Sequence, residues 1–478
     1  MLHSALRRRT AFLCFPALML ACCTAFSATA ATAADRPNVL LINVDDLGWV
    51  DVNCFRERFR GEAFPLPTPN VDRLAREGML FSDAYAACHV CSPTRAAIMS
   101  GQYPARTKVT DWIRPNRARK VAADWQPGLT NPVRGVRIAE NQPFLRREVT
   151  TLAELLGNAG YATGHVGKWH LGREEFYPQE QGFDFNRGGG EWGHPFSGYF
   201  DPYGGNMPHM PPRKKGEYLA FRETDEVIHF LRERDPARPF FVNYWPYEVH
   251  TPVQAPSELV DKAPAGLKGR DAKYAAMVHA LDLALGRVLD YLDDHELTER
   301  TLVIFTSDNG GLFGNAPLRA NKGTPYEGGV RIPQIVRWPG RVEPGTVCSV
   351  PVISTDLLPT VCEAVGVPLP QAPLDGVSLV PLLTGKATAL DRDALYWHFP
   401  HFRRKVHPHS AVRQGDWKLI WYYTEKKPEL FNLRDDRAEH NNLAEQEPEK
   451  VHELKRLIDR FNRETEALVP TGTDTAER

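Results

Sequence analysis

The sequence RPNVLLINVDDLGW, residues 36–49, is an apolar run that ends in two carboxylates, Asp45 and Asp46. An apolar run bounded by Pro and Gly predicts a strand that is buried on both faces, as in a parallel sheet. The sequence TLVIFTSDNGG, residues 301–311, repeats the pattern and ends in Asp308 and Asn309. A third run, RPFFVNYWPYEVHTP at 238–252, has polar residues at its exit.

Helical patterns separate these predicted strands. They lie at residues 68–79, 150–161 and 271–295, and the last of them carries apolar residues at helical spacing. Strands that alternate with helices predict an α/β fold whose sheet is mostly parallel. Ligands of such sheets bind beyond the carboxyl ends of the strands. We therefore expect the carboxylates after residues 44 and 307, together with His250, to converge.

The pattern changes after residue 388. The stretches ALYWHF (394–399), SAVRQGDWKLIWYY (410–423) and ELFNL (429–433) are short and β-like, and residues 447–464 have the pattern of an amphipathic helix. This predicts a small C-terminal α+β subdomain with an antiparallel sheet and a terminal helix. We accordingly divide the chain into residues 1–34, a catalytic domain at 35–388 and the subdomain at 389–478.

The first 34 residues have the order of a signal peptide. Arg7, Arg8 and Arg9 precede the apolar AFLCFPALMLACC, and ATAATAA offers small residues for cleavage. This predicts export to the periplasm or secretion; whether by the Sec or the twin-arginine route stays open. A lipoprotein anchor at Cys22 is disfavoured because Met19 is a poor first residue for that motif. No other segment has 18 consecutive apolar residues, so we expect no transmembrane span in the mature chain.

Charge and cysteine content narrow the function further. The chain has 58 Lys and Arg against 59 Asp and Glu, so it lacks the basic excess of a nucleic-acid-binding protein. After cleavage an odd number of cysteines remains, namely Cys54, Cys88, Cys91, Cys348 and Cys362. An odd count is notable in an oxidising compartment. If Cys91 is set apart, the other four allow two bridges in three pairings, or none.

The polar residues after the first two strands suit a metal ion. Asp45, Asp46, Asp308 and Asn309 offer hard oxygen ligands, which Ca²⁺ or Mg²⁺ prefers and Zn²⁺ does not. Asp and Asn also cap helices and turns, which is the simpler explanation for either pair alone. Two such pairs at equivalent strand ends favour the metal site.

Three further segments carry isolated candidates. In GHVGKWHLG, residues 164–172, Lys168 and His170 lie two apart, so an extended backbone would point both side chains the same way. A cation beside an imidazole suits an oxyanion, although the stretch is also typical of a turn. His250 in VHTP and Lys322 in NKGTPYEGGVRIP are each unremarkable alone.

The stretch CSPTRAAIMSG, residues 91–101, resembles the Cys-x-Pro-x-Arg signature of the type I, formylglycine-dependent sulfatases. The stretches NVLLINVDDLG, GKWHLG, HTP, SDNGG and KGTPYEGGVRIP occur in that family's order as well. The resemblance extends from Asn38 to the C-terminal AVRQGDWKLI and ELFNL runs. It implies an alkaline-phosphatase-like fold, with a large mixed, mostly parallel sheet sandwiched by helices.

The resemblance also implies a site. Cys91 would be oxidised to Cα-formylglycine by a maturation enzyme, and its hydrated aldehyde would be the nucleophile that Arg95 holds. One Ca²⁺ would be bound by the modified residue and by Asp45, Asp46, Asp308 and Asn309. Lys168 and Lys322 would hold the sulfate oxygens. His250 would assist the leaving oxygen, and His170 would act on the second hydroxyl of the hydrate.

This chemistry is hydrolysis of a sulfate monoester to an alcohol and inorganic sulfate. Fixed cations aimed at the sulfate oxygens stabilise the transition state, and a divalent ion polarises one oxygen. The hydrate attacks sulfur, and its second hydroxyl then allows sulfate to be expelled as the aldehyde reforms. We expect a carbohydrate sulfate as substrate, and activity on aryl sulfates as well.

Three alternatives remain. The first is a phosphomonoester or phosphonate ester hydrolase of the same superfamily. The second is a catalytically silent protein that binds sulfated glycans, which the complete set of catalytic candidates disfavours. The third is a secreted protein without this chemistry, in which Cys91 forms a disulfide with Cys88.

The substrate pocket is the least determined part of the sequence. We expect its walls to come from the irregular segments 112–147 and 183–212 and from the junction with the C-terminal subdomain. A structural role is the simpler explanation for each of the polar candidates in these parts, which are Glu191, His194, Asp201, His209, His398, His407 and His409. The basic run RPNRARK, with Arg114, Arg117, Arg119 and Lys120, would suit an anionic polysaccharide or would simply be a solvated loop.

Overall fold

A computed structural model of the chain describes residue 1 and residues 36–472. The expected signal peptide and Cys22 lie outside the described residues. The main sheet has eight strands in the order β10-β2-β9-β8-β1-β7-β5-β6. In that order the strands are β10 (Thr346–Cys348), β2 (Met79–Phe81), β9 (Gln334–Arg337), β8 (Thr301–Ser307), β1 (Asn38–Val44), β7 (Phe240–Trp245), β5 (Ala162–Gly167) and β6 (Phe185–Arg187).

The sheet is mixed and mostly parallel, as the sequence predicts. Only β9 runs against its neighbours, β8 and β2. The four central strands β8, β1, β7 and β5 are mutually parallel and adjacent. Their carboxyl ends therefore meet at one edge of the sheet, which is where ligands of such folds bind.

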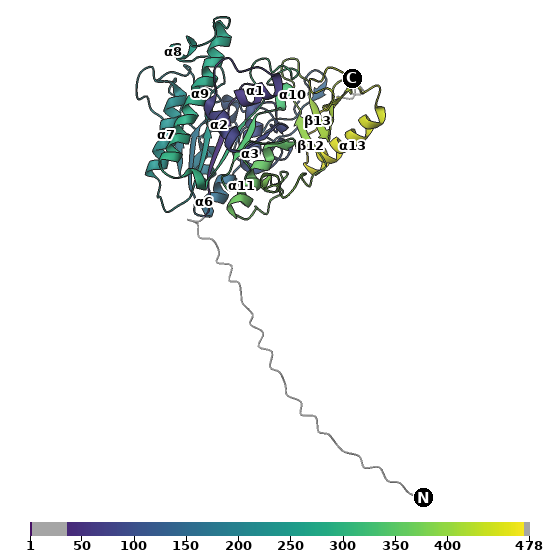
Figure 1. Ribbon diagram of the computed structural model, residues 1–478. Helices are drawn as coiled ribbons and strands as arrows, with labels where there is room; N and C mark the ends of the chain where they lie inside the picture. The colour runs from purple at the N-terminus through teal and green to yellow at the C-terminus, as the bar shows by residue number, and fades with distance from the viewer. Residues whose placement is uncertain (2–35, 473–478) are drawn as a thin grey trace.

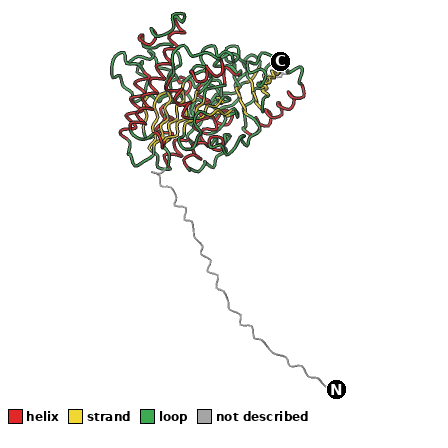
Figure 2. Tube along the Cα trace, in the orientation of Figure 1, coloured by secondary structure: helices red, strands yellow, loops and turns green. Residues whose placement is uncertain are grey.

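Strand β1 is buried along its whole length, and its side chains alternate between two cores. Leu40 and Ile42 join a cluster with α1 (Asn53–Arg60), α2 (Pro69–Glu77), α7 (Leu219–Glu233) and α9 (Gly269–Asp294). Val39 and Leu41 join a second cluster with α3 (Cys91–Ser100), α6 (Leu152–Asn158) and α11 (Leu357–Val365). Helices thus cover both faces of the sheet (Figure 1), and Figure 2 shows the yellow strands between the red helices.

The C-terminal part forms the expected antiparallel sheet and helix. Its strands are β12 (Leu395–Phe399), β13 (His409–Gln414), β14 (Trp417–Tyr422) and β15 (Pro428–Asn432), and α13 (Pro448–Glu464) packs beside them. A third apolar cluster joins this sheet to the catalytic region, because Ala97 of α3 packs in it together with Leu419 and Ile458. The division of the chain at residue 388 stays a prediction.

The remaining elements are short. They are β3 (Ala84–Tyr85), α4 (Pro104–Thr107), α5 (Pro115–Ala118), β4 (Val136–Arg137), η2 (Glu174–Phe176), η3 (Pro178–Gln181), α8 (Ser257–Val260), η4 (Thr298–Arg300), α10 (Glu327–Val330), β11 (Val352–Ile353), η5 (Ser354–Asp356), α12 (Val380–Leu383) and β16 (Thr471–Gly472). Strand β16 pairs with β4, so the last described residues return to the 112–147 segment.

All five cysteines of the described residues are free thiols. The alternative in which Cys91 is bridged to Cys88 is therefore wrong, and none of the three two-bridge pairings forms. Within residues 36–472 each helix is either too short or too polar to span a lipid bilayer.

A buried ionic group ties the C-terminal sheet to the catalytic region. Lys418 Nζ of β14 lies 2.8 Å from Glu327 Oε1 and 2.9 Å from Glu439 Oε1, and all three side chains are inaccessible to solvent. Glu327 also pairs with Arg331 at 2.7 Å and accepts a hydrogen bond from Tyr85 at 2.8 Å. Removing one member of such a group leaves the opposite charge buried without a partner.

Lys418→Met is therefore expected to lower the free energy of unfolding by about 3–5 kcal/mol, as measured by urea denaturation. The control is Lys450→Met, which breaks the solvent-accessible pair with Glu453 and should cost less than about 1 kcal/mol. Equal effects of the two substitutions would contradict a structural role for the buried group.

Candidate active site

The predicted site residues are delivered by adjacent strand ends. Val44, the last residue of β1, pairs with Ser307 of β8, so Asp45 and Asp308 leave the sheet side by side. The Asp46 backbone N–H then donates to Asp308 Oδ1 at 3.2 Å. The pair Asp45–Asp46 and the pair Asp308–Asn309, separated by more than 260 residues in sequence, thus form one cluster.

The next two strands bring the histidine and one of the lysines. Lys168 follows β5, and its backbone N–H donates to Trp245 O at the end of β7 at 2.7 Å. The segment after β7 is held against the end of β1, because Asp45 N–H donates to Glu248 O at 3.0 Å and Val249 N–H donates to Asp45 O at 2.7 Å. These bonds place the adjacent His250 beside the carboxylates.

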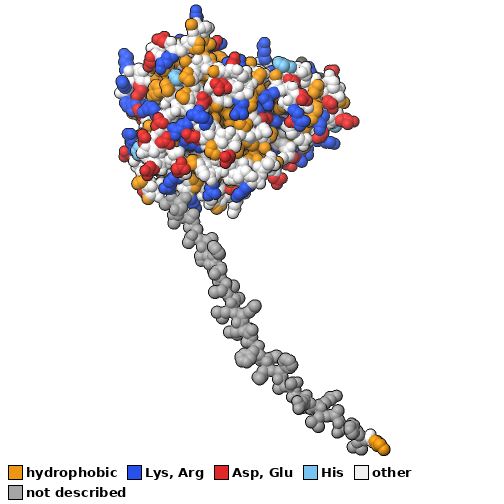
Figure 3. Space-filling model, viewed as in Figure 1, with side chains coloured by type: hydrophobic (Ala, Val, Ile, Leu, Met, Phe, Trp, Pro, Cys, Tyr) orange, Lys and Arg blue, Asp and Glu red, His pale blue; other side chains and the backbone are white. Residues whose placement is uncertain are grey.

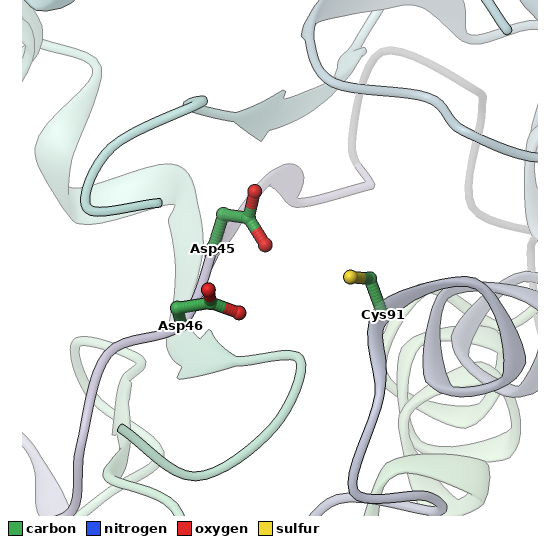
Figure 4. Close-up of side chains that lie close together, drawn as sticks. All are labelled: Asp45, Asp46 and Cys91. Carbon is green, nitrogen blue, oxygen red and sulfur yellow. The ribbon is translucent and has the colours of Figure 1, made fainter. Parts of the chain in front are cut away.

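Cys91 is the first residue of α3, and it points at the carboxylates from the opposite side (Figure 4). Pro93 is tolerated there because first-turn amides lack an intrahelical acceptor. All ten residues of the helix are buried, and Cys91 is 4% exposed. Gly323 N–H donates to His89 O at 2.8 Å, which brings Lys322 Nζ to 3.5 Å from Cys91 Sγ.

Arg95 lies four residues after Cys91, hence on the same face of α3. Its guanidinium is fully buried and donates from Nε to Asp308 Oδ2 at 2.8 Å and from Nη1 to Lys168 O at 2.7 Å. Nη2 lies 3.6 Å from Asp45 Oδ1. Arg95 therefore joins the ends of β1, β5 and β8 rather than contacting Cys91 directly.

The two lysines pair with the two aspartates after β1. Lys168 Nζ is 2.5 Å from Asp45 Oδ2, and Lys322 Nζ is paired with Asp46 Oδ1. His250 Nε2 lies 3.7 Å from Asp46 Oδ2. Together with Arg95 and Asp308, the site holds three cations and three carboxylates, so its buried charges compensate one another.

The oxygen atoms of this cluster fit a hard divalent cation. Asp45 Oδ1, Asp46 Oδ2 and Asn309 Oδ1 are buried without a hydrogen-bond partner. Ligand atoms of Asp45, Asp46 and Cys91 lie within 4.8 Å of one another. Unpaired buried carboxylate and amide oxygens are the donor set that Ca²⁺ and Mg²⁺ prefer.

Burial and the neighbouring charges determine the protonation states of His170, His250 and Cys91. Burial, reinforced by Lys168, lowers the pKa of His170 well below its usual value, and burial with Lys322 does the same for His250. Both imidazoles are therefore neutral near pH 7. Burial raises the pKa of the Cys91 thiol, although Lys168 and Lys322 act against this shift. An unmodified Cys91 is consequently a thiol and a poor nucleophile.

His170 departs from the expected geometry. An extended backbone was expected to align it with Lys168, but the strand ends at Gly167 and His170 has a φ of 58°. Its Nε2 bonds Ile113 O at 2.8 Å, and its Nδ1 has no hydrogen-bond partner. A carbonyl accepts only from an N–H, so this bond places the proton of the neutral ring on Nε2 and leaves Nδ1 as a base.

A pocket of about 720 Å³ opens above Cys91, His170, His250 and Lys322. As expected, its walls come from both irregular segments and from the C-terminal part. The lining residues missed by the sequence analysis include Trp112, Asn116, Trp192 and Arg403. They belong to no motif, and nothing in the sequence marks loop residues that meet only after folding.

Of the seven polar candidates for this pocket, for each of which a structural role is the simpler explanation, only His194 lines it. Glu191 pairs with Arg119, and Asp201 accepts from the Arg213 backbone N–H. The other histidines, His209, His398, His407 and His409, do not line it, and the last three form hydrogen bonds within the C-terminal part. Three residues of the basic run, Arg114, Arg117 and Lys120, do line the pocket.

Comparison with known families gives two matches. A family model described as Sulfatase matches residues 37–367, which include Cys91, Arg95, Lys168, His170, His250, Lys322 and the four predicted metal ligands. A second model, described as N-sulphoglucosamine sulphohydrolase, C-terminal, matches residues 320–466.

Full-length relatives are similar over nearly the same extent. A sulfatase of Formosa agariphila is 32% identical, covering 90% of this chain and 88% of its own. Arylsulfatase A of Homo sapiens is 30% identical over 89% of this chain and 87% of its own. N-acetylgalactosamine-6-sulfatase of Homo sapiens is 30% identical over 92% and 88%.

Solved structures show the same fold. The crystal structure of Ps i-CgsB aligns with a TM-score of 0.76 at 29% identity, covering 92% of this chain and 96% of that one. The same protein in complex with k-i-k-neocarrahexaose aligns with a TM-score of 0.72, over 89% and 92%.

The unpaired oxygens predict a measurable metal effect. In chelator-treated protein, Ca²⁺ at about a hundred times its dissociation constant should raise the free energy of unfolding by about 2.7 kcal/mol, as followed by urea denaturation. Asp46→Asn should remove most of this increment, because it deletes one charged ligand. Asp261→Asn, an exposed control, should keep it. If neither Ca²⁺ nor Mg²⁺ stabilises the wild-type protein, the metal assignment is refuted.

Proposed function

The chain belongs to the sulfatase family, of the alkaline-phosphatase-like type, and from that premise we propose that it hydrolyses carbohydrate sulfate monoesters with a nucleophile made from Cys91 and a bound Ca²⁺. As a sulfuric ester hydrolase it releases an alcohol and inorganic sulfate. The observation that carries the proposal is the convergence of Cys91, Lys322 and the buried Asp46 at the base of the pocket, with Lys322 Nζ 3.5 Å from Cys91 Sγ.

The nucleophile requires a change at Cys91. The raised thiol pKa argues against direct attack by sulfur. Conversion to Cα-formylglycine supplies a hydrated aldehyde, whose hydroxyl attacks the sulfate ester and whose second hydroxyl permits release of sulfate. Because Cys91 begins a wholly buried helix, we propose that the maturation enzyme acts on this segment before it folds.

The acidic cluster holds the metal in this proposal. Asp45, Asp46, Asp308 and Asn309 would hold one Ca²⁺ together with residue 91, and three of their oxygens have no hydrogen-bond partner. Bound there, the ion supplies polarisation of a sulfate oxygen. Arg95 fixes the relative positions of Asp308, Asp45 and the Lys168 carbonyl, so we assign it a positioning role.

The lysines and histidines bind the sulfate and move protons. The ammonium groups of Lys168 and Lys322 bind the sulfate oxygens, and their ion pairs with Asp45 and Asp46 weaken as they do so. His170 Nδ1 takes the proton of the second hydroxyl, as its tautomer allows. The His250 Nδ1–H donates a hydrogen bond to Thr251 O at 2.8 Å. This leaves Nε2 to face the leaving oxygen. Burial and the charge of Lys322 lower the pKa of His250, and a bound anion acts against the Lys322 contribution, which favours the protonated ring that donation from Nε2 requires.

A carbohydrate sulfate is the substrate class that the relatives favour. One relative is an N-acetylgalactosamine-6-sulfatase, and Ps i-CgsB binds a neocarrahexaose. A pocket of about 720 Å³ has room for a sugar beyond the sulfate group. We further propose that the protein is exported to the periplasm or secreted, as its N-terminal sequence predicts, where such glycans are accessible.

Cys91→Ala is expected to lower the rate of 4-nitrophenyl sulfate hydrolysis by about 10³-fold or more, because the nucleophile is lost. Mass spectrometry of the tryptic peptide 77–95 of the wild-type protein should show an aldehyde in place of the thiol. Cys348→Ser, at a partly exposed free cysteine outside the pocket, should retain full activity. Turnover by Cys91→Ala at the wild-type rate would exclude this mechanism.

The alternative phosphoesterase activity is tested by comparing 4-nitrophenyl sulfate with 4-nitrophenyl phosphate. The relatives that align over most of this chain are named sulfatases, so a sulfate ester is the expected preferred substrate. We expect kcat/KM to be at least about tenfold higher for the sulfate, equivalent to 1.4 kcal/mol. Faster turnover of the phosphate would assign the protein to the phosphoesterase branch instead.

A further inference from the structure

The pocket lining carries charge of one sign. Among the described residues that line it, five are cationic, Arg114, Arg117, Lys120, Lys322 and Arg403, and none is Asp or Glu. The chain as a whole has a net charge of −1, and basic and acidic side chains are interspersed on the face shown in Figure 3. A concave site of one sign concentrates counter-ions of the opposite sign.

Two of these cations have no acidic partner. The other three do, with Asp46 beside Lys322, Glu140 at 3.4 Å from Arg117 and Asp111 at 3.7 Å from Arg403. Within residues 36–472, no carboxylate lies within 4.0 Å of the Arg114 or Lys120 side-chain nitrogens. Both side chains are exposed to the pocket, so an anion that binds there does not have to displace an existing ion pair.

The basic segment is held in place by its surroundings. The Arg114 guanidinium lies 5.1 Å from the centre of the Trp112 ring, and the Lys120 backbone N–H donates to Arg117 O at 3.0 Å after the single turn of α5. Arg119 does not line the pocket and instead pairs with Glu191, which compensates the charge of that carboxylate in the neighbouring loop. The basic side chains are thus presented on a supported wall rather than on a free loop.

This wall is continuous with the candidate catalytic groups. The Trp112 ring lies 6.4 Å from the His170 ring, and His194 is stacked against His250 at 6.2 Å. Gly193 lets the backbone of its loop lie close to the His170 ring, since a Cβ at position 193 would lie only 2.7 Å from His170 Cε1. A saccharide with its sulfate at Cys91 would therefore extend along Trp112 towards Arg114 and Lys120.

We propose that this pocket selects saccharides with a second anionic group, a further sulfate or a uronate carboxylate, which Arg114 and Lys120 bind beyond the scissile sulfate. The inference rests on the proposed function for the placement of that sulfate. Arg114 offers the paired N–H donors that suit either oxyanion, and Lys120 adds a point charge. The neutral remainder of the sugar lies against Trp112 and Trp192.

The test uses competition against 4-nitrophenyl sulfate hydrolysis. The competitors are N-acetylgalactosamine 6-sulfate, its 4,6-disulfate, and the 6-sulfated glucuronyl disaccharide with its carboxylate either free or methyl-esterified. In the wild-type protein at least one doubly charged competitor should have an inhibition constant about tenfold below that of its singly charged counterpart. The disulfate and the free carboxylate identify which anion is recognised.

Arg114→Gln/Lys120→Gln should reduce that preference to less than about twofold, because both charges are lost while the side chains stay polar. Lys214→Gln/Lys215→Gln removes the same charge from exposed residues outside the pocket and should leave the preference at its wild-type value. A wild-type protein without preference for a second charge, or a preference that survives in Arg114→Gln/Lys120→Gln, would overturn the inference.

Failure of the proposed function gives a different result. If the wild-type protein hydrolyses no sulfate ester, the same four compounds are compared by calorimetric binding, which needs no turnover. Binding that favours the second charge and depends on Arg114 and Lys120 would support the anion site without the enzyme activity. Normal hydrolysis of 4-nitrophenyl sulfate without any charge preference would leave the proposed function intact and remove only this inference.

Discussion

The site depends on one constraint, which is that three carboxylates and three cations share a volume almost inaccessible to solvent. Asp45, Asp46 and Asp308 would each be costly to bury alone, and so would Arg95, Lys168 and Lys322. Each is stable because the others compensate it at close range. Arg95 is central, since its guanidinium joins Asp308, Asp45 and the Lys168 carbonyl in one contact set. The cluster therefore exists only as a whole, and the surrounding fold has to bring its members together.

The parallel sheet meets this requirement. Strands β8, β1, β7 and β5 end at one edge, and each is followed by a residue of the site. Helix α3 approaches the same edge and presents Cys91 and Arg95 on one face, four residues apart. The backbone bonds between Asp45, Glu248 and Val249 leave little freedom at the end of β1. The candidate catalytic groups thereby lie at hydrogen-bonded strand ends, which suits precise positioning.

The pocket above the cluster has a different origin. Its walls are loops, and its C-terminal contribution, Arg403, comes from a part of the chain that is tied to the catalytic region by the third apolar cluster and by Lys418. Loops vary without disturbing the sheet, so substrate selection and sulfate chemistry are physically separable here. The one-signed lining and the two cations without acidic partners belong to this outer layer.

Much of this arrangement followed from local sequence. The apolar runs ending in Asp45 and Asp308 predicted buried parallel strands, whose polar ends converge in an α/β sheet. The resemblance of the motifs around Cys91, Lys168, His250 and Lys322 to the sulfatase signature implied the rest of the site. Other features depended on contacts between distant segments. These are the left-handed φ of His170, the role of Arg95 as a link between strand ends, and the failure of six of the seven polar candidates to reach the pocket. The sequence by itself determined the sheet, its polar edge and the reaction class. Only the tertiary structure decided which loop side chains face the substrate, since that orientation is set by packing between segments that no local pattern relates.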